Sequence, residues 1–262
     1  MIRYTLLFCL FAMTLMTTAA TDARADSGPR EFYEIRSYVL NEGASAEAID
    51  GYLKEALIPA LQRHGAGPVG VFSNSENDET GSTRVIVAIP FDNAAAAAEA
   101  QQKLKSDSVY QQAAEQHMSL ARNEIPYRRV ESELLVAMQC MPQLKVPSKM
   151  MDNEDRVYEL RIYESGNERL GNLKVDMFND GEVPIFLDSG IQPVFIGQAV
   201  VGPYTPNLTY LTVYPNEEAR NQAWQNFRTH PDWKVLSKVP KYQGTVSKIH
   251  KYVLTPKSYS QM

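Results

Sequence analysis

Two short stretches of this chain each carry a glutamate, an arginine and a tyrosine at alternating positions. Side chains two positions apart lie on the same face of a β-strand, so each stretch would present a row of polar groups. A carboxylate beside a guanidinium forms an ion pair, an arginine can hold an anion, and a tyrosine hydroxyl can donate a hydrogen bond. The candidate ligand-binding residues are therefore Glu34, Arg36, Tyr38, Glu159, Arg161 and Tyr163.

Three interpretations of these polar rows are open. The favoured one is a structural ion-pair ladder that fixes the register of two sheets, because a buried charge is costly unless it is paired. The second is a polar lining for a small ligand, in which Arg36 or Arg161 holds an anion and a tyrosine donates a hydrogen bond. The third is proton transfer by a glutamate whose pKa has been raised by partial burial. The rows alone assign no catalytic residue.

An internal repeat explains why the polar row occurs twice. A shift of 125 positions places the first row on the second without a gap. The same shift aligns a further set of identical residues: Tyr33 with Tyr158, Pro59 with Pro184, Gly65 with Gly190, Pro68 with Pro193 and Val69 with Val194. So many identities in one register indicate a duplicated unit.

Each copy is expected to contain four strands and two helices, from the spacing of its apolar residues. The first copy has predicted strands at 32–39, 68–74, 83–89 and 128–138, a helix from Ser45 to Gly65 that is kinked at Pro59, and a helix that begins after Asp92 or Asn93. The second copy has predicted strands at 157–163, 193–201, 207–214 and 246–254, and helices at 169–188 and from Asn216. This βαββαβ order is typical of a ferredoxin-like sheet with both helices on one face.

The element order predicts an α+β fold of two tandem ferredoxin-like domains, at residues 31–140 and 156–256, joined by a linker at 141–155. The helices cover one face of each sheet, so the two remaining faces can bury each other as a sandwich-like or barrel-like pair. On the first strand, Tyr33 and Ile35 belong to the apolar face. If that face meets the helices, the polar row faces the space between the sheets.

The composition limits the class of protein. The chain has 262 residues and a net charge of -5, which argues against nucleic-acid binding because such proteins concentrate cations against the phosphates. Residues 1–25 combine Arg3, an apolar run too short to span a membrane and a final Ala25, as in a cleaved signal peptide. We therefore expect a periplasmic or secreted protein without a stable membrane span. Phe8 and Cys9 also loosely resemble a lipobox.

Local motifs for metal, nucleotide or nucleophile chemistry are missing from the sequence. After cleavage Cys140 would be the only cysteine, so no intramolecular disulfide is expected. The chain has no phosphate-binding glycine loop and no serine nucleophile elbow. The histidines, which are His64, His117, His230 and His250, are too far apart in sequence to form a local metal motif. We expect no metal and no cofactor, although His117 could face a pocket and ligate haem iron.

Two segments carry a family resemblance. The stretch VYELRIY, from Val157 to Tyr163, is similar to the opening strand of NIPSNAP-family domains, which carries a YELRxY signature. The segment from Trp224 to Trp233 resembles the tryptophan-rich second helix and following turn of that family. The resemblance covers about residues 157–256. The first copy keeps its polar row but lacks an equivalent of Trp224, as expected of a diverged copy.

The resemblance implies a dimeric α/β-barrel fold, formed here within one chain as a pseudo-dimer. It implies little chemistry, since eukaryotic members have been linked to vesicle traffic and mitochondrial signalling. Relatives that share the barrel include haem-degrading and quinone-forming monooxygenases, which is a likeness of fold alone.

Two functional hypotheses follow from the sequence. The leading one is an exported, non-catalytic module that binds a small molecule or another protein, with further assembly of pseudo-dimers into a homo-oligomer as an option. The alternative is a monooxygenase-like enzyme, either cofactor-independent or haem-dependent. That alternative predicts an enclosed cavity between a sheet and its helices that holds His117 or a tyrosine.

Overall fold

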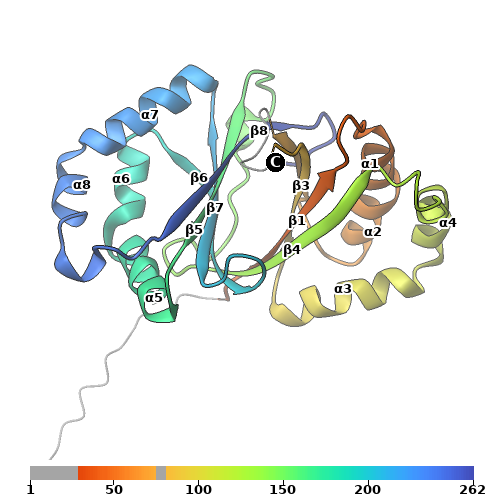
Figure 1. Ribbon diagram of the computed structural model, residues 1–262, viewed down its shortest axis with the longest axis horizontal. Coiled ribbons are helices and arrows are strands. Elements are labelled where there is room, and N and C mark those ends of the chain that lie inside the picture. The colour runs from red at the N-terminus through yellow and green to blue at the C-terminus, as the bar shows by residue number, and fades with distance from the viewer. Residues whose placement is uncertain (1–28, 75–80) are drawn as a thin grey trace, which may run out of the picture.

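The computed structural model describes residues 29–74 and 81–262. The predicted signal peptide and its cleavage site lie outside the described residues. Figure 1 shows the strands at the centre of the molecule with a group of helices on each side. The helices on one side come from the first copy and those on the other side from the second copy.

The first copy follows the expected order of elements. Its elements are β1 (Phe32–Leu40), α1 (Glu47–Tyr52), η1 (Leu53–Leu57), α2 (Ile58–Arg63), β2 (Gly70–Asn74), β3 (Arg84–Phe91), α3 (Ala94–Ser106), α4 (Ser108–Met118) and β4 (Tyr127–Ala137). A short 3-10 turn, η2 (Ser148–Met150), lies in the segment that leads to the second copy.

The second copy repeats this order. Its elements are β5 (Val157–Glu164), α5 (Glu168–Met177), η3 (Phe178–Glu182), α6 (Val183–Asp188), β6 (Gln192–Val201), β7 (Asn207–Tyr214), α7 (Glu217–Thr229), α8 (Pro231–Leu236), η4 (Pro240–Tyr242) and β8 (Lys248–Pro256). In each copy the predicted second helix is divided in two, at Asp107 in the first copy and at His230 in the second. Both residues cap the shorter helix with a side-chain acceptor.

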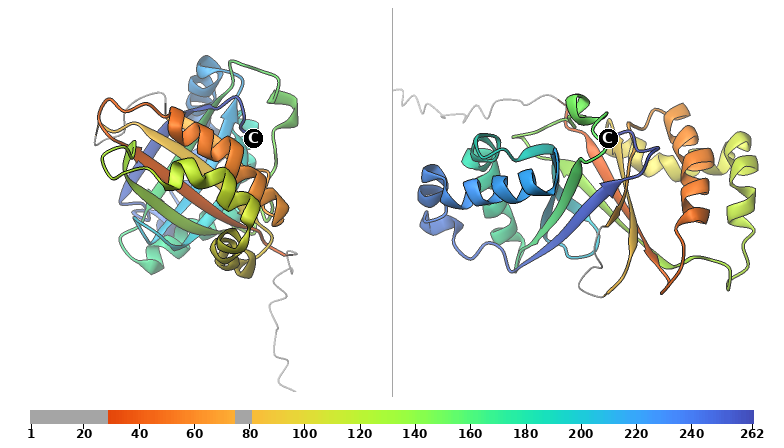
Figure 2. Two further views of the ribbon diagram at one scale, coloured as in Figure 1. Left: turned by 90° about the vertical axis from the view of Figure 1, so that its right-hand side faces the viewer. Right: turned by 90° about the horizontal axis from the view of Figure 1, so that it is seen from above.

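The described strands form a closed barrel in the order β1-β3-β2-β8-β5-β7-β6-β4. Within each copy the strands pair as in a ferredoxin-like sheet, with β1 between β3 and β4, and β5 between β7 and β8. The two sheets join edge to edge, where Phe72 of β2 pairs with Pro256 of β8 and Ala137 of β4 pairs with Gly197 of β6. The predicted pair of mutually buried sheets is therefore a dimeric α/β-barrel within one chain (Figure 2).

The interior of the barrel is filled by the apolar faces of both sheets. Tyr33 and Ile35 of β1 pack in one buried cluster with Tyr158 and Leu160 of β5 and with Phe195 of β6. The expectation that this face would meet the helices, leaving the polar rows between the sheets, is wrong. Two sheets that close into one barrel enclose a narrow interior, and large apolar side chains fill most of it. The polar rows consequently lie on the outer face of the barrel, beneath the helices.

Each helical layer contains the same irregularity in its first helix. A π-helical turn, η1 or η3, precedes a proline at the start of the next α-helix, and these prolines are Pro59 and Pro184. Proline has no backbone N–H and crowds the preceding turn, so the regular hydrogen-bond ladder is broken there. The predicted break at Pro59 and its repetition at Pro184 are confirmed. Gly65 and Gly190 follow these helices with φ of 82° and 87°, which a residue without a Cβ adopts at little cost.

Residues 257–262 follow β8 and pack on the first copy. Ser260 Oγ and Gln261 Oε1 accept hydrogen bonds from the backbone N–H groups of Val71 and Val69. Met262 is fully buried in the apolar cluster of the barrel interior. This segment therefore ties the end of the second copy to strand β2 of the first, a contact that the pattern of predicted elements does not include.

None of the helices in residues 29–74 and 81–262 is both long and apolar enough to cross a membrane.

Candidate ligand-binding site

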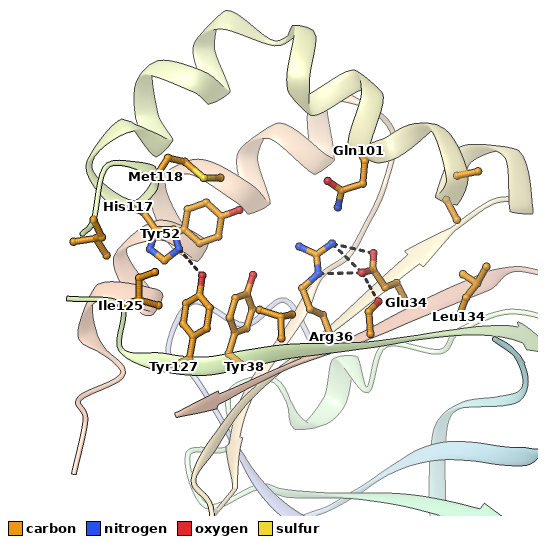
Figure 3. Close-up of a pocket in the computed structure, with 15 residues that line it drawn as sticks. Glu34, Arg36, Tyr38, Tyr52, Gln101, His117, Met118, Ile125, Tyr127 and Leu134 are labelled. Atoms are coloured by element: carbon orange, nitrogen blue, oxygen red, sulfur yellow. Dashed lines mark hydrogen bonds and ion pairs between the residues drawn. The ribbon is translucent and has the colours of Figure 1, made fainter. Parts of the chain in front are cut away.

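A pocket of about 750 Å³ lies in the first copy, between the outer face of the barrel and its covering helices. Its floor is formed by Glu34, Arg36 and Tyr38 of β1, with the neighbouring residues of β4 beside them. Its roof comes from α3, where Gln101 projects from the helix toward Arg36 across open space (Figure 3). Gln101 is exposed, so the pocket opens to solvent and is not the enclosed cavity that the enzyme hypothesis predicts.

The polar floor is an ion pair that is complete without a ligand. Arg36 donates from both Nε and Nη2 to the Glu34 carboxylate, each at 3.0 Å, and Ser132 Oγ donates to Glu34 Oε1 at 2.7 Å. Burial alone would lower the pKa of Arg36, but the charge of Glu34 and the neighbouring Tyr38 more than offset this and raise it. The guanidinium is therefore permanently charged and neutralised by Glu34. Arg36 is accordingly a poor site for a further anion.

The side wall of the pocket is aromatic. The His117 ring of α4 stacks on Tyr52 of α1, with ring centroids 4.2 Å apart, and its Nε2 lies 3.4 Å from the Tyr127 hydroxyl. Burial lowers the pKa of His117 and raises the pKa values of Tyr52 and Tyr127, so all three rings are neutral near pH 7. The Tyr52 hydroxyl also pairs with that of Tyr110, at 2.9 Å. Figure 3 shows this wall at one end of the pocket and the ion pair in its middle.

In the second copy the equivalent space is filled by the protein itself. Trp224 of α7 lies with its ring 3.5 Å from the guanidinium carbon of Arg161, and its Nε1 donates to Glu159 Oε2 at 3.0 Å. Arg220, one turn earlier on the same helix, donates to the same carboxylate oxygen at 2.7 Å. Glu159 is 0% exposed and Trp224 only 5%. The second polar row is thus a closed structural site that also contains Tyr163 and its partner Tyr210.

Two residue differences on the second helix separate the open site from the filled one. Asn93 and Asn216 cap α3 and α7 in the same way, each accepting a hydrogen bond from the N–H three residues later. Counting from these caps, Ala97 occupies the position of Arg220 and Gln101 the position of Trp224. The first copy therefore keeps the polar floor while losing the two large side chains that cover it in the second.

The predicted site residues are thus brought together as two separate trios, one in each copy, and not as one group of six. The predicted ion pairs within the trios are present, at Glu34 with Arg36 and at Glu159 with Arg161. Sequence reasoning missed the roof and the wall, which include Gln101, Tyr52 and Tyr127. Comparing the two second helices from their asparagine caps would have found Gln101, because Trp224 has a polar residue as its counterpart.

The other chemically suggestive residues have structural surroundings. Among residues 29–74 and 81–262, no group of three or more His, Cys, Asp or Glu side chains is arranged to hold a metal ion. Burial raises the pKa of Cys140 to about 11, which leaves its thiol protonated and unreactive at neutral pH. His250 is buried against Glu164, and His230 caps α8 through its ring nitrogen Nδ1. His117 is the histidine that faces the pocket.

The family of this chain follows from comparison with known proteins. The NIPSNAP family model matches residues 33–140 and 158–261, which is most of the chain in two consecutive matches. The chain therefore belongs to the NIPSNAP family and contains two NIPSNAP units. No curated protein sequence gives a significant match.

Solved structures share the barrel at low sequence identity. A protein from Fusobacterium nucleatum proposed as a monooxygenase aligns over 87% of this chain and 92% of its own, with a TM-score of 0.58 and 10% identity. A second protein proposed as a monooxygenase, from Lactobacillus acidophilus, aligns over 87% and 94%, with a TM-score of 0.51 and 13% identity. A NIPSNAP-like domain protein from Burkholderia xenovorans aligns over 42% and 91%, with a TM-score of 0.38 and 17% identity. At these identities the first two likenesses describe the fold alone.

Proposed function

We propose that this protein is a binding module for a small organic molecule, and that the pocket of the first copy is the binding site. The observation that carries the proposal is the contrast between the copies. The same polar floor is covered by Trp224 and Arg220 in one copy and left open beneath Ala97 and Gln101 in the other. Removing the side chains that cover an ion pair does not stabilise the fold. Ligand binding would explain why the first copy has an open site where the second copy has a closed one.

The surroundings of the pocket indicate the polarity of its ligand. The aromatic wall of Tyr52, His117 and Tyr127 favours an apolar, ring-containing body. The ion pair on the floor has no net charge, and two of the donor nitrogens of Arg36 are already committed to Glu34. A ligand without a negative charge therefore fits better than the anion that the polar row suggested.

A substitution that restores the roof of the second copy tests this proposal. Gln101→Trp would place an indole over Arg36 and close the pocket, whereas Gln102→Trp puts the same side chain at the next, exposed position of α3, outside the pocket lining. A library of small aromatic compounds would be screened by ligand-observed NMR against the wild type and both variants. We expect compounds that bind the wild type and Gln102→Trp but not Gln101→Trp. Binding that is equal in all three proteins would refute the proposal.

Catalysis at the same pocket is a second candidate, supported by His117. Its Nδ1 is buried without a hydrogen-bond partner among the described residues, and its ring is neutral and lies beside the Tyr127 hydroxyl. Because Tyr127 also lines the pocket, its hydroxyl can pass a proton from an acidic substrate to the neutral imidazole. Dioxygen uptake with 1-naphthol as substrate, lost in His117→Ala, would support a cofactor-independent monooxygenase. Uptake equal in the variant and the wild type would exclude this role of His117.

The haem-dependent form of the enzyme hypothesis does not fit the residues present. An axial ligand needs a ring nitrogen directed into open space. His117 has its Nδ1 buried, its Nε2 beside the Tyr127 hydroxyl and its ring face against Tyr52.

Export of the chain remains part of the proposal. The arrangement of Arg3, the apolar run and Ala25 supports cleavage after residue 25. The mass and N-terminal sequence of the protein recovered from a secretion-competent host would test it. A chain that begins at Asp26 is expected, and a full-length intracellular chain would contradict export.

A further inference from the structure

In the second copy, a side chain of the protein occupies the site that corresponds to the open pocket of the first copy. This occupant is the Trp224 side chain, a planar heteroaromatic ring with one N–H donor. We propose that the pocket of the first copy binds a planar aromatic heterocycle carrying a ring N–H, an indole-like group, stacked on Arg36 and donating to Glu34. The inference rests on the proposed function and names the class of ligand.

The floors of the two sites have the same chemistry in the same register. Glu34 and Arg36 occupy the positions of Glu159 and Arg161 on the corresponding strands, and in both pairs the arginine Nε donates to the glutamate. In the second copy the carbon of this guanidinium lies over the Trp224 ring, 3.5 Å from its centroid. An arginine face held flat by its own carboxylate is a surface on which an aromatic ring stacks. Arg36 is held in the same manner.

The hydrogen-bonding capacity of the two glutamates also points to an N–H donor. Glu159 Oε2 accepts from Trp224 Nε1 and Arg220 Nη1, both of which come from the helix above it. The corresponding oxygen, Glu34 Oε2, accepts from Arg36 Nη2, while Ser132 donates to the other oxygen. A carboxylate oxygen has room for more than one donor. The donors that α7 supplies in the second copy have no counterpart on α3 at Ala97 and Gln101, so a ligand N–H can take their place.

The roof leaves the space that such a ring needs. Gln101 occupies the helix position that corresponds to Trp224. Its side chain is smaller than an indole and ends above Arg36 in Figure 3. Ala97 leaves free the volume that Arg220 fills in the second copy. The ring would lie between Gln101 and Arg36, with its edge toward the aromatic wall at Tyr52 and His117. An anionic substituent is disfavoured because Glu34 would face it.

Indole, 1-methylindole and naphthalene are the probes that test this inference. Isothermal titration with the wild type should show indole binding, because it has both the ring and the N–H. A hydrogen bond to a charged acceptor is lost in 1-methylindole and naphthalene, so we expect their affinities to be lower by about tenfold or more. Gln101→Trp should abolish indole binding and Gln102→Trp should leave it unchanged. Ala97→Leu serves as a second blocking variant if Gln101→Trp does not fold.

The outcomes separate this inference from the proposed function. If indole and 1-methylindole bind equally and both are blocked by Gln101→Trp, the pocket binds ligands but the N–H contact with Glu34 is wrong. If the probes do not bind while other compounds bind and are blocked, the indole-like class is wrong and the proposed function stands. If no compound that binds the wild type is blocked by either variant, both fail.

Discussion

The guanidinium carbon of Arg161 lies over the Trp224 ring, 3.5 Å from its centroid, and the indole donates its N–H to the carboxylate that pairs with that arginine. The first copy has the same glutamate and arginine without the tryptophan. The second copy thus has a self-filled site, and the first copy has an open polar floor. The contrast connects two residue differences on one helix to the presence of a pocket.

Removing the indole should expose how much it stabilises the second copy. Trp224→Ala deletes a buried aromatic side chain and leaves Glu159 without one of its donors, so we expect a loss of about 3–5 kcal/mol in the free energy of unfolding. Urea denaturation measures this change. The matched variant in the first copy, Gln101→Ala, removes an exposed side chain above an open pocket and should change stability by about 0.5 kcal/mol or less. Equal losses in both variants would contradict the assignment of a filled and an open site.

Added indole should rescue the tryptophan variant. Indole can occupy the space left in Trp224→Ala and reproduce both contacts, so millimolar indole should raise the melting temperature of that variant by mass action. The same concentration of 1-methylindole should raise it less. An unchanged melting temperature would mean that the space collapses and that its polar floor does not select an indole.

A buried ion pair on α5 and η3 offers a second test of the comparison between copies. Lys174 Nζ and Glu182 Oε2 lie 2.7 Å apart and are both buried, whereas the first copy has Ile49 and Leu57 at the corresponding positions. Breaking the pair with Lys174→Met leaves a buried unpaired carboxylate and should cost about 3–5 kcal/mol. The double variant Lys174→Ile with Glu182→Leu introduces the apolar residues that the first copy has at these positions. Its free energy of unfolding should be nearly unchanged or higher. Urea denaturation of both single variants and the double variant measures the interaction free energy between Lys174 and Glu182. A double variant that loses the sum of the two single losses would contradict the prediction.

Glu133 should make the stability of the protein depend on pH. It is buried at one end of the barrel, where Asn207 Nδ2 and Thr209 Oγ1 donate to its carboxylate, and burial raises its pKa to about 7. Its pKa in the unfolded chain is near 4.5, so between these values the folded state binds more protons than the unfolded state. The contribution of Glu133 to the free energy of unfolding is therefore complete below about pH 4.5. It declines as the pH rises to 7, by a few kcal/mol, as expected from the size of the pKa shift.

Glu133→Gln provides the control for this pH dependence. The amide keeps an oxygen for Asn207 and Thr209 but does not titrate. Urea midpoints measured between pH 5 and pH 8 should fall with rising pH in the wild type and change less in the variant. A variant that falls as steeply as the wild type would show that Glu133 is not the group responsible.

The sequence was sufficient for the order of elements, because repeated alternation and repeated prolines identify each unit without reference to the rest of the chain. It was not sufficient for the choice of face. Tyr33 and Tyr38 lie on opposite faces of β1 and both are buried, so the period of two does not say which face enters a barrel that only the second copy completes. Residues 257–262 follow the last predicted strand, and the burial of Met262 depends on its contact with β2 of the first copy.

The floor of the candidate site could be predicted from the sequence, but its roof and wall could not. The floor is a local pattern on one strand, whereas its roof comes from a helix about 65 residues later in the sequence and its wall from three further elements, α1, α4 and β4. Trp224 indicates the roof of the second copy, but the absence of a tryptophan at Gln101 does not by itself indicate a pocket in the first copy. The connection becomes visible once Asn93 and Asn216 are aligned as equivalent caps.

The central claim is that the first copy presents an open counterpart of the tryptophan-filled site. A crystal structure of the protein soaked in indole tests it most directly. The account predicts one indole between Gln101 and Arg36, with its nitrogen within hydrogen-bonding distance of Glu34, and none over Arg161, which Trp224 already covers. A pocket closed by its own side chains, or indole bound only elsewhere on the molecule, would contradict the account.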